Sequence, residues 1–104
     1  MPMPPQRDHR ITRAEAAALT RRHREAAAAK QERGGMFLRE AVQELLGQKG
    51  CAGLRYYHGR REDGTAAMVL VAVDAEGNDM AEGTILEWHY PCPPLCGESN
   101  ELNP

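Results

Sequence analysis

A continuous apolar run over Ala66–Val73 constrains the fold of this chain more than any other feature. Its residues are β-branched or aliphatic for the most part, which favours a strand in the middle of a sheet. Turn-forming residues flank the run, with Arg60–Gly64 before it and Asp74–Asp79 after it. Such polar segments are typical of short connections between neighbouring antiparallel strands. The run is therefore predicted to be the central strand.

Strands are also predicted on either side of this run. The segment that begins at Gly53 and the segment Thr84–Tyr90 both alternate with a period of two, as the two faces of a strand do. Three strands joined by short turns form an antiparallel meander, here over residues 53–90. One face of a sheet this small has to be covered by a helix.

Two helices are predicted before the sheet. Thr12 and Glu15 have the spacing of a capping box, so a helix rich in Ala and Arg is expected to begin there. Gly34 and Gly35 stop it, which gives a helix over residues 12–33. A second helix is predicted over residues 36–46, where apolar residues recur at spacings of three and four. This second helix is expected to cover the sheet.

The predicted fold class is α+β, with two N-terminal helices, a three-stranded antiparallel meander and an irregular Pro/Cys tail. A chain of 104 residues has room for one domain, which we expect over residues 12–97. Residues 1–11 are Pro-rich and charged, and residues 98–104 are polar and acidic. Both segments are predicted to be disordered, because they have too few apolar residues to pack.

Charge is laid out unevenly along the chain. Residues 7–33 carry eight Lys or Arg and four acidic residues, whereas residues 74–104 carry seven acidic residues and no Lys or Arg. We do not expect nucleic-acid binding, because the basic segment lacks aromatic stacking residues and the net charge is −2. No stretch approaches the roughly 18 apolar residues of a membrane span. A cytoplasmic location is predicted, where cysteines stay mostly reduced.

The segment from His89 to Cys96 concentrates side chains that bind soft metal ions. Zinc in proteins takes four ligands from thiolate, imidazole or carboxylate groups. His89, Cys92 and Cys96 supply three such groups near one end of the predicted sheet. His58, Cys51 or a water molecule would complete the set. Zinc is therefore the one cofactor that the sequence suggests.

Two prolines decide whether the sulfurs of Cys92 and Cys96 meet. A polyproline II conformation would place the two Cα atoms about 12 Å apart, too far for a disulfide. A turn with Pro94 at its second position would instead make the thiols neighbours. Thiol redox chemistry lacks support from nearby cations, since the surrounding sequence is acidic. In the remaining interpretation the prolines end a strand and the cysteines pack as small apolar residues.

The leading functional prediction is a small, non-enzymatic accessory or protein-interaction module. The chain has no Gly-rich phosphate loop and no nucleophile elbow. A protein partner or a second copy of the chain is expected to bind the Ala/Arg-rich helix through Ile11 and Leu19, with Arg21 and Arg22 at the rim. Tyr57 is a further candidate contact. The alternatives are a zinc-binding or thiol-redox protein, and a carrier whose Cys/Pro-rich C-terminal segment is modified.

Four short motifs carry a resemblance to known sequences: Gly53–Tyr57, Val69–Asp74, Gly77–Met80 and Pro91–Cys96. Together they resemble a group of small uncharacterised bacterial proteins, common in Bacteroidota, that end in a Pro-Cys-Pro-Pro-x-Cys run. The resemblance covers roughly the C-terminal half of the chain. It brings no established activity, so it bears on the fold alone.

Overall fold

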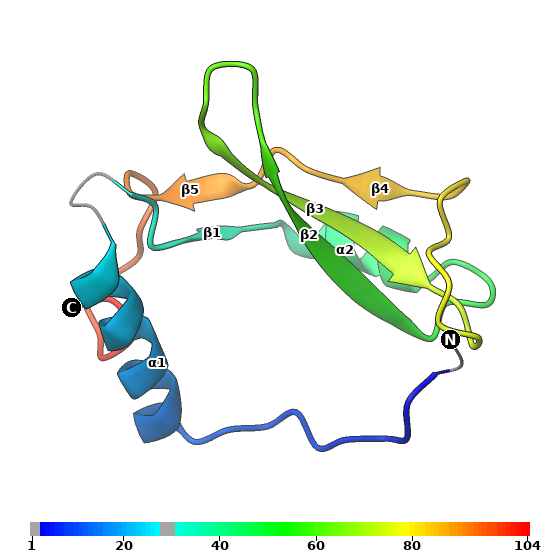
Figure 1. The fold of residues 1–104 in the computed structure, drawn as a ribbon, viewed down its shortest axis with the longest axis horizontal. Helices are drawn as coiled ribbons and strands as arrows, with labels where there is room; N and C mark the ends of the chain where they lie inside the picture. Colours follow the sequence, from blue (N-terminus) through cyan, green and yellow to red (C-terminus); the bar gives the residue numbers. More distant parts are fainter. Residues whose placement is uncertain (1–2, 28–30) are drawn as a thin grey trace. The chain divides into compact units, whose positions relative to one another are not determined.

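The computed structural model describes residues 3–27 and 31–104 (Figure 1). In chain order its elements are α1 (Arg13–Ala26), β1 (Gly34–Met36), α2 (Arg39–Leu46), β2 (Gly53–Arg60), β3 (Ala66–Val73), β4 (Ile85–Leu86) and β5 (Tyr90–Cys92). The strands form two small sheets, ordered β2-β3-β4 and β1-β5. The chain divides into two compact units. Unit 1 comprises residues 37–89 with the segment that ends at Gln6, and unit 2 comprises residues 7–36 and 90–104.

The α+β class holds, but the predicted order of elements is wrong. Strand β1 lies between the two helices and pairs antiparallel with β5, so that Gly34 is opposite Cys92. The two glycines at this point are not the helix stop that was predicted, because they form extended backbone that pairs with a distant segment. Helix α1 ends at Ala26, before the predicted end at residue 33, and residues 28–30 lie outside the described residues.

The predicted central strand is confirmed as β3, which lies between β2 and β4. Leu70 is opposite Tyr56 on one side and Leu86 on the other. Leu45 of α2 is fully buried against Leu70 and Ala72, in a cluster completed by partly buried residues: Phe37, Cys51, Met68, Met80 and Leu86. Figure 1 shows α2 behind the twisted β2–β3 hairpin. This small hydrophobic core stabilises unit 1.

The predicted third strand over residues 84–90 is divided into β4 and β5, which belong to different sheets. The backbone of Trp88 interrupts it, with a φ of 60°. This left-handed conformation is incompatible with a strand and is costly for an aromatic residue. The meander therefore stops after Leu86, and the chain is redirected before β5 begins.

In unit 2 the capping box at the start of α1 is confirmed. Thr12 Oγ1 accepts from the Glu15 amide at 3.1 Å, and the Thr12 amide donates to Glu15 Oε1 at 3.2 Å. The segment predicted as a disordered tail carries an antiparallel bridge between Asn100 and Asn103. Arg24 Nη1 also donates to the carbonyl oxygen of Leu102 at 2.9 Å.

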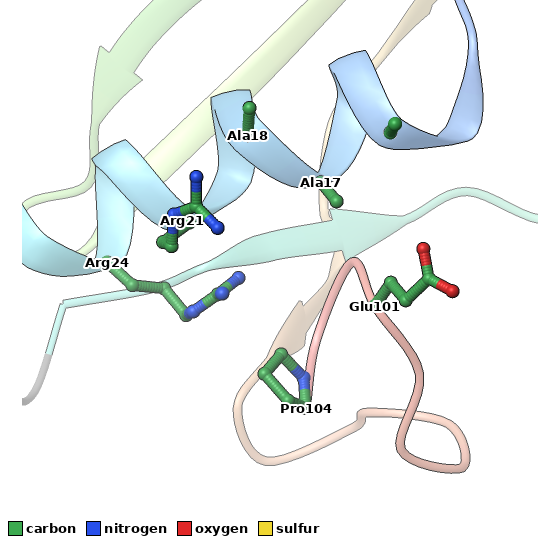
Figure 2. A pocket seen from close by; sticks show the side chains of 7 residues that line it. Ala17, Ala18, Arg21, Arg24, Glu101 and Pro104 are labelled. Carbon is green, nitrogen blue, oxygen red and sulfur yellow. The ribbon is translucent and has the colours of Figure 1, made fainter.

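A pocket of about 490 Å³ lies between α1 and this C-terminal segment. Figure 2 shows the alanine face of α1 on one side of it, and Glu101 and Pro104 on the other. The lining residues are Ala14, Ala17, Ala18, Arg21, Arg24, Glu101 and Pro104. The helix that was predicted to bind a partner thus lines this pocket together with the chain's own C-terminal residues.

Candidate functional site

The cysteines of the Pro/Cys run are joined in unit 2. Cys92 and Cys96 form a disulfide, with their Cα atoms 4.8 Å apart. The Leu95 amide donates to the Pro91 carbonyl oxygen at 2.8 Å, which closes the turn between them. The chain therefore turns here and does not keep the extended polyproline II conformation, but the turn is closed over Pro91–Leu95 and does not place Pro94 at its second position. The cytoplasmic location stays a prediction.

The structure distributes the five predicted zinc ligands over both units. Cys92 and Cys96 are bonded to each other, whereas His58 packs edge-to-face on Tyr56 in unit 1 with ring centroids 5.6 Å apart. Cys51 is a free thiol that donates to the Gly53 carbonyl oxygen at 3.3 Å. Among the described residues, no group of three or more His, Cys, Asp or Glu is arranged to hold a metal ion. Zinc binding by the reduced chain stays a prediction.

His89, the fifth predicted ligand, belongs to a different arrangement in unit 1. It is a buried polar residue, with 7% of its surface exposed, and its ring lies 6.2 Å from that of Phe37. Its Nδ1 is 3.1 Å from Glu87 Oε2 and donates to it when that nitrogen carries the proton. The imidazole of His89 is thus paired with the carboxylate of Glu87, two residues earlier in the sequence.

Glu87 is the centre of this arrangement. Its carboxylate accepts from Arg61 Nη2 and from the Met68 amide, in addition to His89. About a fifth of each side chain of the Arg61–Glu87 pair is exposed, 19% and 20%. The pair therefore lies in a partly dehydrated setting, where a charge-assisted hydrogen bond is strong and an unmatched charge is costly.

The acidity of Glu87 reflects these contacts. Burial by itself raises the pKa of the carboxyl group, because it disfavours the charged form. Hydrogen bonds from His89, the Met68 amide and Arg61 outweigh burial and lower the pKa from the ordinary 4.5 to about 2. Glu87 is consequently ionised throughout the physiological range and holds the Arg61 guanidinium in place.

Trp88 contacts Arg61 of this ion pair and is 77% exposed. Its ring centroid is 4.5 Å from the Arg61 guanidinium carbon, within cation–π distance. A left-handed backbone costs on the order of 1–3 kcal/mol for such a residue. An exposed cation–π contact returns only about 0.5–1 kcal/mol, and the ring buries little surface. At that value the cation–π contact alone does not offset the cost of the Trp88 backbone conformation.

Arg61 makes a second unfavourable contribution to the free energy of folding. Its Nε is the only buried side-chain nitrogen or oxygen without a hydrogen-bond partner among the residues that the structure describes. Such a donor loses its hydration without compensation, which is unfavourable by about 1–3 kcal/mol. Uncompensated groups of this kind are uncommon in native proteins and require an explanation. We call the group formed by Arg61, Glu87, Trp88 and His89 the tryptophan platform.

The residues that were predicted to contact a partner are all exposed. Ile11 and Leu19 are each 55% exposed, and Arg21 and Arg22 are also exposed. Tyr57 is 45% exposed, and its hydroxyl donates to Asp79 Oδ2 at 2.5 Å. Tyr57 is opposite Val69 in the strand register. Their exposure is compatible with binding, although none of them combines it with a strained backbone.

Sequence reasoning did not single out the tryptophan platform. The one available signal was a lone tryptophan, the only one in the chain, between a carboxylate and an imidazole. Arg61 is 26 residues from Glu87 and could not be assigned to it from the sequence.

Comparisons with known protein families, curated proteins and solved structures find no significant match. Within residues 3–27 and 31–104, no helix is long and apolar enough to cross a bilayer. The case for function therefore depends on the geometry of the described residues.

Proposed function

We propose that this protein is a protein-interaction module whose recognition surface is the tryptophan platform. The observation that carries the proposal is Trp88, which is 77% exposed although its backbone is held in a left-handed conformation. Strained residues persist only where the surrounding structure enforces them, and they cluster at functional positions. An exposed tryptophan under such constraint is a feature expected of a binding site.

The chemistry of the platform suits a protein partner. Tryptophan and arginine are the residues most enriched among those that dominate interface energetics. The Arg61 guanidinium lies against the Trp88 ring and also pairs with the Glu87 carboxylate. Because these side chains are already ordered, a partner would lose little additional conformational entropy on binding them. The platform is a pre-organised contact rather than a flexible one.

The partner is either another protein or a second copy of this chain. The basic helix remains a candidate for additional contact, since Ile11 and Leu19 are exposed on α1. We consider this helix a weaker candidate for partner binding than the platform, because its alanine residues line the pocket together with Glu101 and Pro104.

Photo-crosslinking tests this proposal. A photoreactive phenylalanine analogue would replace Trp88 in the full chain, expressed in its native cells, and Glu62 would be replaced in the control. Glu62 is exposed in the hairpin turn after β2, next to Arg61 in the sequence. We expect one discrete crosslinked species from position 88 and none from position 62. Its mass distinguishes a second copy from another protein.

Competition makes the result specific. Adding excess unlabelled wild-type chain should abolish the crosslink from position 88, whereas a Trp88→Ala chain should not compete. The same crosslinked species from both positions, or equal competition by the Trp88→Ala chain, would rule out the platform as the binding surface.

A further inference from the structure

We propose that the Cys92–Cys96 disulfide is a thiol–disulfide exchange site, at which an external thiolate attacks Cys96 and the sulfur of Cys92 leaves. The two cysteines differ in access: Cys96 is exposed after the turn, whereas Cys92 is half-buried on β5. Exchange requires a thiolate to approach one sulfur, and its rate depends on access and on the stability of the leaving thiolate. Access therefore selects Cys96 as the attacked sulfur.

The surroundings of Cys92 suit a leaving thiolate. Asn103 Nδ2 donates to Cys92 Sγ at 3.6 Å, within range for a hydrogen bond to sulfur. Asn103 Oδ1 accepts from Arg33 Nη1 at 2.8 Å. Because an arginine can only donate, it requires the amide oxygen to face it and so turns the NH₂ group toward the sulfur. The amide would stabilise negative charge that develops on Cys92.

Through Asn103, the Arg33 cation is linked to Cys92, whereas the sequence around Cys92 is acidic. Arg33 is 70 residues from Asn103, and Asn103 is 11 residues from Cys92. The three meet because β1 pairs with β5, where the Arg33 amide donates to the Cys92 carbonyl oxygen at 2.7 Å. Nearby cations and hydrogen-bond donors are what make a cysteine thiolate a good leaving group.

The exchange balances with a dithiol as reductant. One thiolate of the dithiol attacks Cys96 Sγ, the disulfide bond breaks, and its electron pair leaves with Cys92 as a thiolate. The second thiol loses its proton and attacks the dithiol sulfur of the mixed disulfide, which releases Cys96 as a thiolate. Two electrons have moved to the protein, the dithiol has become a cyclic disulfide, and its two protons are taken up by the protein thiolates.

The site of attack is tested with reduced glutathione as the probe, on the full chain carrying Cys51→Ala. The reaction is stopped with acid at early times, and peptide fragmentation locates the glutathione adduct. We expect the adduct on Cys96 in most molecules. An adduct found on Cys92 as often as on Cys96 would overturn the proposal, and this measurement needs no change near the disulfide.

The leaving-group role is tested with variants of Asn103. Asn103→Ala should slow the initial attack about three- to tenfold, because one hydrogen bond to a developing charge is lost. Asn103→Asp should slow it further, since a carboxylate would repel the leaving thiolate. The control is Asn100→Ala, which loosens the same loop by removing the acceptor of the Leu102 and Asn103 amides but keeps the donor to Cys92.

The control variant should exchange within about twofold of the unsubstituted chain, because the contact with the leaving sulfur is retained. Two results would contradict the role given to Asn103: an Asn103→Asp chain that exchanges as fast as the parent, or an Asn100→Ala chain that is slowed as much as Asn103→Ala. The first would show that charge at this position is irrelevant. The second would show that the loop, rather than the amide donor, controls the rate.

Discussion

Leu45→Ala should lower the free energy of unfolding of unit 1 by about 2–5 kcal/mol, the range for truncating a fully buried leucine. Leu45 is the one large side chain with no exposed surface among the described residues, and it joins α2 to Leu70 and Ala72 of β3. Small domains are stable by only about 5–15 kcal/mol. The substitution therefore removes a large part of the stability of this unit, measurable as a lower urea midpoint by circular dichroism.

Leu46→Ala is the matched control on the same helix. Leu46 is adjacent to Leu45 but 46% exposed, so its truncation removes fewer packing contacts and should cost less than about 1 kcal/mol. Equal losses for the two variants would mean that α2 does not pack on the sheet through Leu45.

Glu87→Gln should destabilise unit 1 by about 2–3 kcal/mol at neutral pH. Breaking a buried ion pair costs about 3–5 kcal/mol, and the exposed fifth of this pair reduces that loss. The neutral amide also presents donor hydrogens to the donors of Arg61 and His89, which leaves one of them unmatched. Urea denaturation at neutral pH measures the change, with exposed Glu82→Gln as the control.

The same variant tests the pH dependence. The folded-state pKa of Glu87, about 2, is below its ordinary value of 4.5, so its ionisation stabilises the folded state above pH 4.5. That contribution is lost as the pH falls from 4.5 toward 2, because the unfolded chain takes up the proton first. Wild type should lose stability across this window more steeply than Glu87→Gln.

A residual slope should remain in the variant. Hydrogen bonds from Tyr57 and Arg55 also lower the pKa of Asp79, although burial opposes them. Identical slopes for wild type and Glu87→Gln would contradict the assignment of Glu87 as the centre of the platform.

Features determined by neighbouring residues were predictable from the sequence. The strand over Ala66–Val73 and the cap at Thr12 depend on local composition and spacing, and both occur as expected. The turn at Asp74 is of the same kind, since its carboxylate accepts from the Glu76 and Asn78 amides.

Features that join distant segments were not predictable. Gly34 and Gly35 carry no side-chain pattern, so their pairing with β5 left no periodic signal. The ion pair between Arg61 and Glu87, and the relay from Arg33 to Cys92, likewise depend on contacts that only the folded chain creates.

Trp88 illustrates the same limit at a single residue. Alternation of residues 84–90 indicated a strand, but the left-handed conformation of Trp88 interrupts it between β4 and β5. Departures from local preference are expected at functional positions, where stability is not the only requirement.

The fluorescence of Trp88 tests the central claim most directly, because it is the only tryptophan in the chain. In dilute, folded protein we predict an emission spectrum like that of tryptophan in water and efficient quenching by acrylamide. A blue-shifted emission that acrylamide quenches poorly would show that the ring is buried in the fold. That result would contradict the proposal that Trp88 is presented to a partner.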